Sequence, residues 1–102
     1  MLIVLTTTPN IEEAESLAEK VVAKRLAACV QILPGMKSFY FWEGEVRSEA
    51  EQLLLIKTLP EKYEDLERFI LENHSYTVPE IAAIKPSEVS EGYLGWLRDY
   101  LE

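Results

Sequence analysis

Cysteine and histidine are almost absent from this chain, whose 102 residues contain one of each, Cys29 and His74. A single cysteine can form no disulfide within the chain, so the composition does not point to an oxidising compartment. One histidine and one cysteine are also too few for a four-ligand zinc site in one chain. No CxxC or HExxH motif, acidic calcium loop or Gly-rich phosphate loop is present. We therefore expect a protein that is not an enzyme.

Basic residues are also scarce, with 10 Lys and Arg against 18 Asp and Glu and a formal net charge of -8. Such a surface repels phosphate backbones and acidic lipids, so we expect neither nucleic acid nor membrane as a partner. It attracts cations, although solubility alone explains the same charge. The first residues, MLIVLTTTP, have no basic segment before the apolar run, which is too short to span a membrane. We expect a cytoplasmic protein.

Hydrophobic residues make up 48% of the chain, enough for one folded domain over residues 1–102. The first apolar run is β-branched and is typical of a strand buried on both faces. Apolar periodicity and turn residues predict strands over 2–7, 29–33 continued over 36–42, 45–57 and 81–84, and helices from Asn10 toward Leu26, from Pro60 to about Asn73, and after Ser90. This order is the α+β, ferredoxin-like βαββαβ arrangement with an added C-terminal helix. Right-handed crossovers place the first strand between the third and fourth, with both main helices on one face.

The second and third strands should form an unusually long hairpin around Gly44. Each arm, at about 13 or 14 residues and roughly 3.3 Å per residue, approaches 45 Å, whereas the first and last strands have about half that length. The tip must therefore protrude as a two-stranded ribbon with exposed aromatic residues on both faces. These are Phe39, Tyr40, Phe41 and Trp42. Exposed rings on an isolated ribbon favour a homo-oligomer over a free arm that binds another protein.

Several motifs, spread in order over nearly the whole chain, resemble the CutA family of divalent-ion tolerance proteins. They are RLAAC (25–29), Ser38, Tyr40, Trp42 and Gly44 in the hairpin, Lys57 with Thr58, HSYTVPE (74–80) and YLGWL (93–97). The resemblance implies a ferredoxin-like homotrimer, similar to the PII signalling proteins, with ribbons exchanged between subunits. It also implies binding of copper and other divalent ions, and a role in metal tolerance. Ser75 replaces a proline usual in the family and Gln31 an asparagine, which should loosen the turn after His74 and shift one amide contact.

His74 has three possible roles: a polar plug at the end of a helix, a metal ligand, or a general base. No serine, cysteine or carboxylate pair lies nearby in the sequence to form a known catalytic arrangement with His74. The metal role rests mainly on the family resemblance. We expect His74 to face a cleft between subunits. Cys29 is the second candidate metal ligand, although its position predicts a small core residue. Topology places the two at opposite edges, so they could share an ion only if another chain supplied one of them.

The fold should also place two other parts of the chain near His74: the loop after the first strand, and Glu80. If the ribbon of a neighbouring subunit reaches this edge, it closes a cleft lined by Tyr76, Glu80, Trp42 and Lys57. The rings could equally pack at an interface, and Lys57 could pair with Glu80 or another acid.

Two functions therefore remain open. One is a trimeric protein of metal tolerance that weakly binds copper or another divalent metal ion. The other is a PII-like trimeric scaffold that binds a small metabolite or a partner protein in the intersubunit cleft. An acylphosphatase-like enzyme shares the fold class, but the loop TTTPN has no arginine to hold a phosphate.

Overall fold

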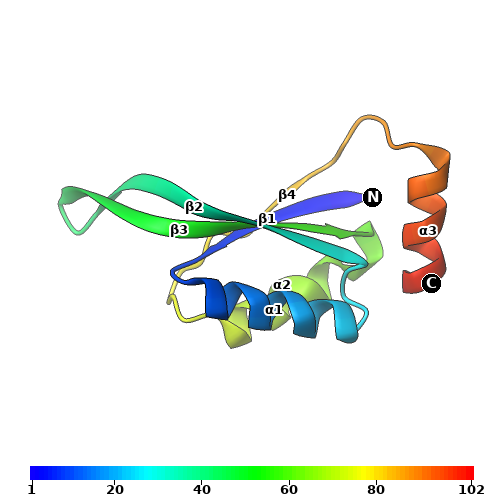
Figure 1. Ribbon diagram of the computed structural model, residues 1–102, viewed down its shortest axis with the longest axis horizontal. Coiled ribbons are helices and arrows are strands. Elements are labelled where there is room, and N and C mark those ends of the chain that lie inside the picture. The colour runs from blue at the N-terminus through cyan, green and yellow to red at the C-terminus, as the bar shows by residue number, and fades with distance from the viewer.

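The first strand, β1, runs through the middle of a four-stranded antiparallel sheet in a computed structural model that describes all 102 residues (Figure 1). The strand order β2-β3-β1-β4 confirms the ferredoxin-like topology, with β1 between β3 and β4. None of the helices combines the length and apolar character needed to cross a bilayer. The elements are β1 (Leu2–Thr8), α1 (Ile11–Ala23), β2 (Cys29–Trp42), β3 (Glu45–Thr58), a 3₁₀ turn (Pro60–Lys62), α2 (Tyr63–Asn73), β4 (Ala82–Ile84) and α3 (Glu91–Leu101).

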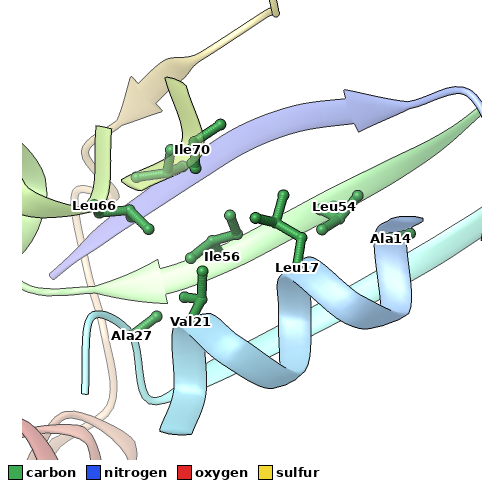
Figure 2. Close-up of a cluster of buried hydrophobic side chains, with 9 residues drawn as sticks. Ala14, Leu17, Val21, Ala27, Leu54, Ile56, Leu66 and Ile70 are labelled. Carbon is green, nitrogen blue, oxygen red and sulfur yellow. The ribbon is translucent and has the colours of Figure 1, made fainter. Parts of the chain in front are cut away.

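Helices α1 and α2 cover one face of the sheet and bury the main core there (Figure 2). The Asn10 side chain accepts a hydrogen bond of 2.8 Å from the Glu13 N–H, which caps the first turn of α1 as its spacing predicts. The apolar stripe of each helix then faces β1 and β3. Burying each large side chain contributes about 1.5–3 kcal/mol, so this layer supplies much of the stability. The fully buried members are Val4, Ala14, Val21, Ala27, Leu54, Ile56, Leu66 and Ile70.

The opposite face of the sheet has no layer over it within one chain, and the expectation that β1 is buried on both faces is wrong for the single chain. Ile3 and Leu5 are only half-buried, whereas Val4 between them is fully buried. On the same side of the neighbouring strands, Leu33 is 46% and Ile84 49% exposed. We call this the open face. An apolar sheet face of this kind is a surface that a partner normally covers.

Strands β2 and β3 each contain 14 residues, and β1 pairs with β3 only as far as Gln52. The far ends therefore protrude as a two-stranded ribbon, which confirms the long hairpin (Figure 1). At its tip Glu43 and Gly44 have φ of 51° and 82°, the pair of positive values that a two-residue hairpin turn requires. A bulge lies between Leu33 and Met36, where a proline and a glycine interrupt the strand.

Helix α3 packs across the end of the sheet remote from the ribbon (Figure 1). Leu97 and Leu101 join Ala28 and Leu59 in a second small apolar cluster. The Tyr100 hydroxyl donates to the Val22 carbonyl over 2.5 Å, which fixes α3 to the last turn of α1. The added C-terminal helix is thus an integral part of the fold.

Candidate functional site

A cleft lies between the ribbon and the loop that follows α2, with a volume of about 640 Å³. Three of the four residues expected at a cleft line it: Trp42 from the ribbon, and Tyr76 and Glu80 from the loop. One chain brings all three together by itself, because its own ribbon passes over its own loop. Lys57 is not part of the cleft and lies at the other end of the sheet, where its partner is Gln31.

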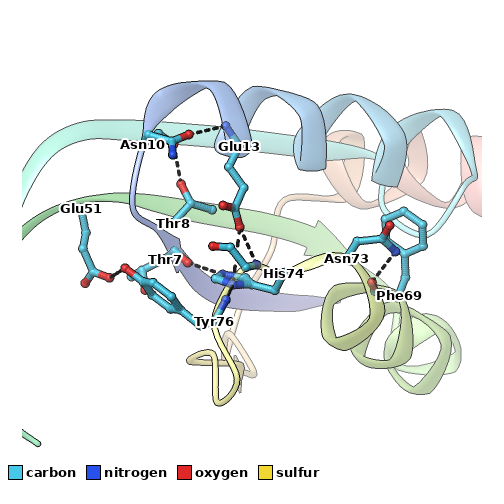
Figure 3. Close-up of polar contacts among 10 residues, drawn as sticks. Thr7, Thr8, Asn10, Glu13, Glu51, Phe69, Asn73, His74 and Tyr76 are labelled. Carbon is cyan, nitrogen blue, oxygen red and sulfur yellow. Dashed lines mark hydrogen bonds and ion pairs between the residues drawn. The ribbon is translucent and has the colours of Figure 1, made fainter.

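The floor of the cleft holds a buried carboxylate that sequence reasoning missed. Glu51 is 7% exposed, and its Oε2 accepts a hydrogen bond of 2.8 Å from the Tyr76 hydroxyl (Figure 3). Burial, and then this bond to Glu51, raise the pKa of the Tyr76 hydroxyl well above its usual range. The sequence shows Glu51 only as one of several acids in a polar strand segment. Its burial depends on Tyr76, which is 25 positions away.

Two further residues of the ribbon, Tyr40 and Glu49, also line the cleft. The hydrogen bond from Tyr40 to Glu49 is the main cause that raises the pKa of the Tyr40 hydroxyl. Both phenols therefore act as neutral hydrogen-bond donors toward carboxylates at neutral pH.

Replacing Tyr76 by Phe should make the protein less sensitive to alkali. The native state keeps the Tyr76 proton, whereas in the unfolded chain the phenol ionises near its ordinary pKa of 10.0. The contribution of the Tyr76 proton to the free energy of unfolding is thus complete below about pH 10. It falls as pH rises above about 10, by up to about 1.4 kcal/mol per pH unit for one proton. Urea unfolding at pH 9 to 11.5 measures this slope. An unchanged slope in the Phe variant would show that Tyr76 is not coupled to folding.

The side chain of His74 is fully buried at the end of α2, and both ring nitrogens are bonded within the chain (Figure 3). Nε2 lies 2.6 Å from the Thr7 carbonyl oxygen, which can only accept, so Nε2 carries the proton and donates. Nδ1 accepts a bond of 2.9 Å from the Tyr76 N–H, so it carries no proton. The ring is therefore neutral, and it ties the loop of the cleft to the end of β1. Metal ligation by His74 would require it to give up one of these bonds.

The serine that replaces the usual proline has a contact of its own. The Ser75 N–H donates to Glu13 Oε2 over 3.1 Å, a bond that proline cannot make because it lacks this N–H. The same carboxylate oxygen lies 3.5 Å from Nδ1 of His74. The start of α1 thereby holds the loop after α2.

Cys29 does not lie in the core, and that expectation is wrong. The neighbouring Val30 packs against the core, so Cys29 points to the open face, paired with Lys57 and half-buried. Burial, with a further contribution from Cys29, raises the pKa of the Tyr93 hydroxyl, which shows that thiol and phenol are neighbours. Next to them Gln31 Oε1 accepts from the Lys57 ammonium over 2.5 Å, the amide contact that the longer side chain makes.

Cys29 and His74 lie at opposite ends of the sheet. His74 contacts Thr7, which pairs with Leu53, whereas Cys29 pairs with Lys57. Four residues of strand separate these positions, which is about 13 Å at roughly 3.3 Å per residue. No three His, Cys, Asp or Glu side chains of one chain are grouped to hold a metal ion.

Together, the sheet order, the long ribbon and the cleft at its base define a class: small ferredoxin-like α+β proteins with a projecting hairpin. The profile of one family of this class, described as CutA1 divalent ion tolerance protein, matches residues 2–100. The chain belongs to the CutA1 family, which confirms the resemblance seen in its motifs.

Individual relatives agree with this assignment. The chain is 45% identical over 97 residues to the divalent-cation tolerance protein CutA of Thermus thermophilus, covering 95% of this chain and 94% of that one. It is 44% identical over 98 residues to the chloroplastic protein CutA of Arabidopsis thaliana, covering 96% of this chain and 54% of that protein, so it spans about half the length of the plant relative. The structure of the periplasmic divalent cation tolerance protein CutA from Archaeoglobus fulgidus matches over 100% of both chains, with a TM-score of 0.96 and 37% identity.

Proposed function

We propose that this chain acts in divalent-ion tolerance as a non-enzymatic, cytoplasmic homotrimer that weakly binds copper or another divalent metal ion between its subunits. Membership of the CutA1 family supports the tolerance role. The observation that carries the intersubunit site is the open face, an apolar surface that a single chain leaves uncovered and that also presents Cys29.

Cys29 fits this proposal better than His74 does. Its thiol is half-buried on the surface that assembly would cover, and a thiolate is a soft ligand that copper prefers. Cys29 belongs to no group of three His, Cys, Asp or Glu side chains within its own chain, so a second chain would complete the coordination. His74, by contrast, already uses both nitrogens inside its own chain.

Replacing Cys29 by Ser should weaken copper binding by a factor of ten or more while changing the free energy of unfolding by less than about 1 kcal/mol, because the residue is outside the core. Calorimetric titration of the assembled protein with copper measures the affinity. Ser38→Ala, in the ribbon, is the control. Equal copper affinity in the wild type and the Cys29 variant would contradict the proposed ligand.

A second function is favoured by a separate observation, the cleft of about 640 Å³ at the base of the ribbon. A cavity of this size suits a small molecule, so the chain could serve as a PII-like scaffold whose cleft holds a metabolite. The cleft lies on the same side of the sheet as the open face, since Thr7 and Glu51 both line it. A neighbouring subunit would then border the ligand.

A further inference from the structure

Glu51 is an unusual carboxylate because it is 93% buried without a basic partner, being 7% exposed. The ion pairs of this structure join Arg47 with Glu45, Arg68 with Asp65, and Arg98 with Glu102. None of them includes Glu51. A buried carboxylate normally has a cation beside it, and the single hydrogen bond from Tyr76 does not supply one. The charge faces the cleft instead.

The rest of the cleft is also negative. Glu49 and Glu80 line it with Glu51, and Arg47 is the one basic residue among them. The Arg47 Nε lies 3.4 Å from the exposed Glu45 and makes no hydrogen bond, so one guanidinium stands against three carboxylates in the lining. Carboxylates therefore dominate the potential inside the cleft, which disfavours phosphates and other anions and favours a positively charged ligand.

The side chains that line the cleft favour an organic cation over a bare metal ion. Phe39, Tyr40, Trp42 and Tyr76 line the cleft, and the faces of such rings attract ammonium groups by about 0.5–2 kcal/mol each. A divalent ion needs several oxygen ligands that converge on one point, and no three acidic side chains of the chain are arranged in that way. An amine on an apolar stem needs only one carboxylate and fills the remaining volume with carbon.

We propose that the cleft between the ribbon and residues 75–80 binds a small organic cation, a primary amine carried on a short apolar stem. The ammonium group lies against Glu51, and the stem lies along Tyr40 and Trp42. This inference rests on the second function proposed above, the metabolite-binding scaffold, and names the ligand class of its cleft.

Binding is tested on the assembled protein with butylammonium as the probe, and with 1-butanol and butyrate as neutral and anionic probes of matched length. Trp42 lines the cleft and Trp96 lies on α3, so the Trp96→Phe background assigns the fluorescence change to the cleft. Butylammonium should give a saturable change that weakens with added salt. Butanol and butyrate should give none at the same concentrations.

Glu51→Gln should reduce butylammonium affinity tenfold or more, because the amide keeps the shape and removes the charge. Glu72→Gln, which removes the same charge from the exposed surface of α2, should leave the affinity unchanged. If Glu51→Gln does not fold, as judged by circular dichroism, Glu80→Gln at the exposed rim of the cleft should still reduce affinity several-fold.

The outcomes distinguish failure of the organic-cation proposal from failure of the scaffold function on which it rests. Equal binding by wild type and both cleft variants would overturn the role of the carboxylates. Binding of butyrate or ATP in place of butylammonium would overturn the cation class and keep the scaffold function. No binding of any probe would overturn both. Copper binding by the same sample tests the metal function independently.

Discussion

Leu33→Asp should convert the assembled protein into monomers. Leu33 lies on the open face and is 46% exposed in one chain, so the single chain tolerates the new carboxylate at little cost. Covering that carboxylate with another subunit would bury an unpaired charge, which costs several kcal/mol. We expect assembly to weaken by at least a hundredfold, whereas the fold of each chain is kept.

Leu71→Asp is the matched control, because Leu71 is 52% exposed on α2, on the other side of the sheet. Light scattering at low micromolar concentration should give about three times the chain mass of 11.7 kDa for the wild type and Leu71→Asp, and about one chain mass for Leu33→Asp. Trp42→Asp in the ribbon should weaken assembly as well. A Leu33→Asp protein that keeps the wild-type mass would show that the open face is not the interface.

His74→Ala should lower the free energy of unfolding by about 3 kcal/mol. The substitution removes a fully buried ring and leaves the Thr7 carbonyl and the Tyr76 N–H without their partners. A buried polar group left unpaired costs about 1–3 kcal/mol, and the cavity adds to this. The loss is a large share of the 5–15 kcal/mol that is typical of a small protein.

Asn73→Ala is the control for this change, because its side chain makes one exposed bond, to the Phe69 carbonyl over 2.8 Å. Its loss should cost less than about 1 kcal/mol. Urea unfolding measures both variants, and copper titration of the same samples distinguishes the two roles of His74. A His74→Ala protein of wild-type stability that has lost copper binding would make the histidine a metal ligand and not a structural residue.

Sequence reasoning predicted the elements and their connections because these depend on local patterns. The aliphatic runs, the Asn10 cap and the turn before Glu45 each act within a few residues, and crossover handedness leaves one order for the strands. The differences at the boundaries are small. A 3₁₀ turn over Pro60–Lys62 precedes α2, and β4 begins at Ala82, one residue later than expected.

The error at Cys29 concerns the direction in which its side chain points. Cys29 begins a strand, and side chains along a strand alternate between the two faces of the sheet. Because the residues on both sides of Cys29 are apolar, the sequence does not show which face Cys29 occupies. The register with β3 decides it, and places Cys29 beside Lys57 on the open face. Lys57, expected at the cleft, differs in its position along the strand: it pairs with Ile3 and Cys29, at the end of the sheet remote from the cleft.

By itself, the sequence determined the family, the ferredoxin-like order of elements and the protrusion of the ribbon, because periodicity, turn residues and strand length are properties of continuous segments. Only the tertiary structure decided that Glu51 is buried beside Tyr76, that His74 has no free nitrogen, and that one chain alone forms a cleft. These facts depend on contacts between distant residues, His74 with Thr7 at 67 positions and Tyr76 with Glu51 at 25. Burial and hydrogen-bond partners arise only when folding brings such distant segments together, because a side chain alone does not specify which of several acids or carbonyls it will meet.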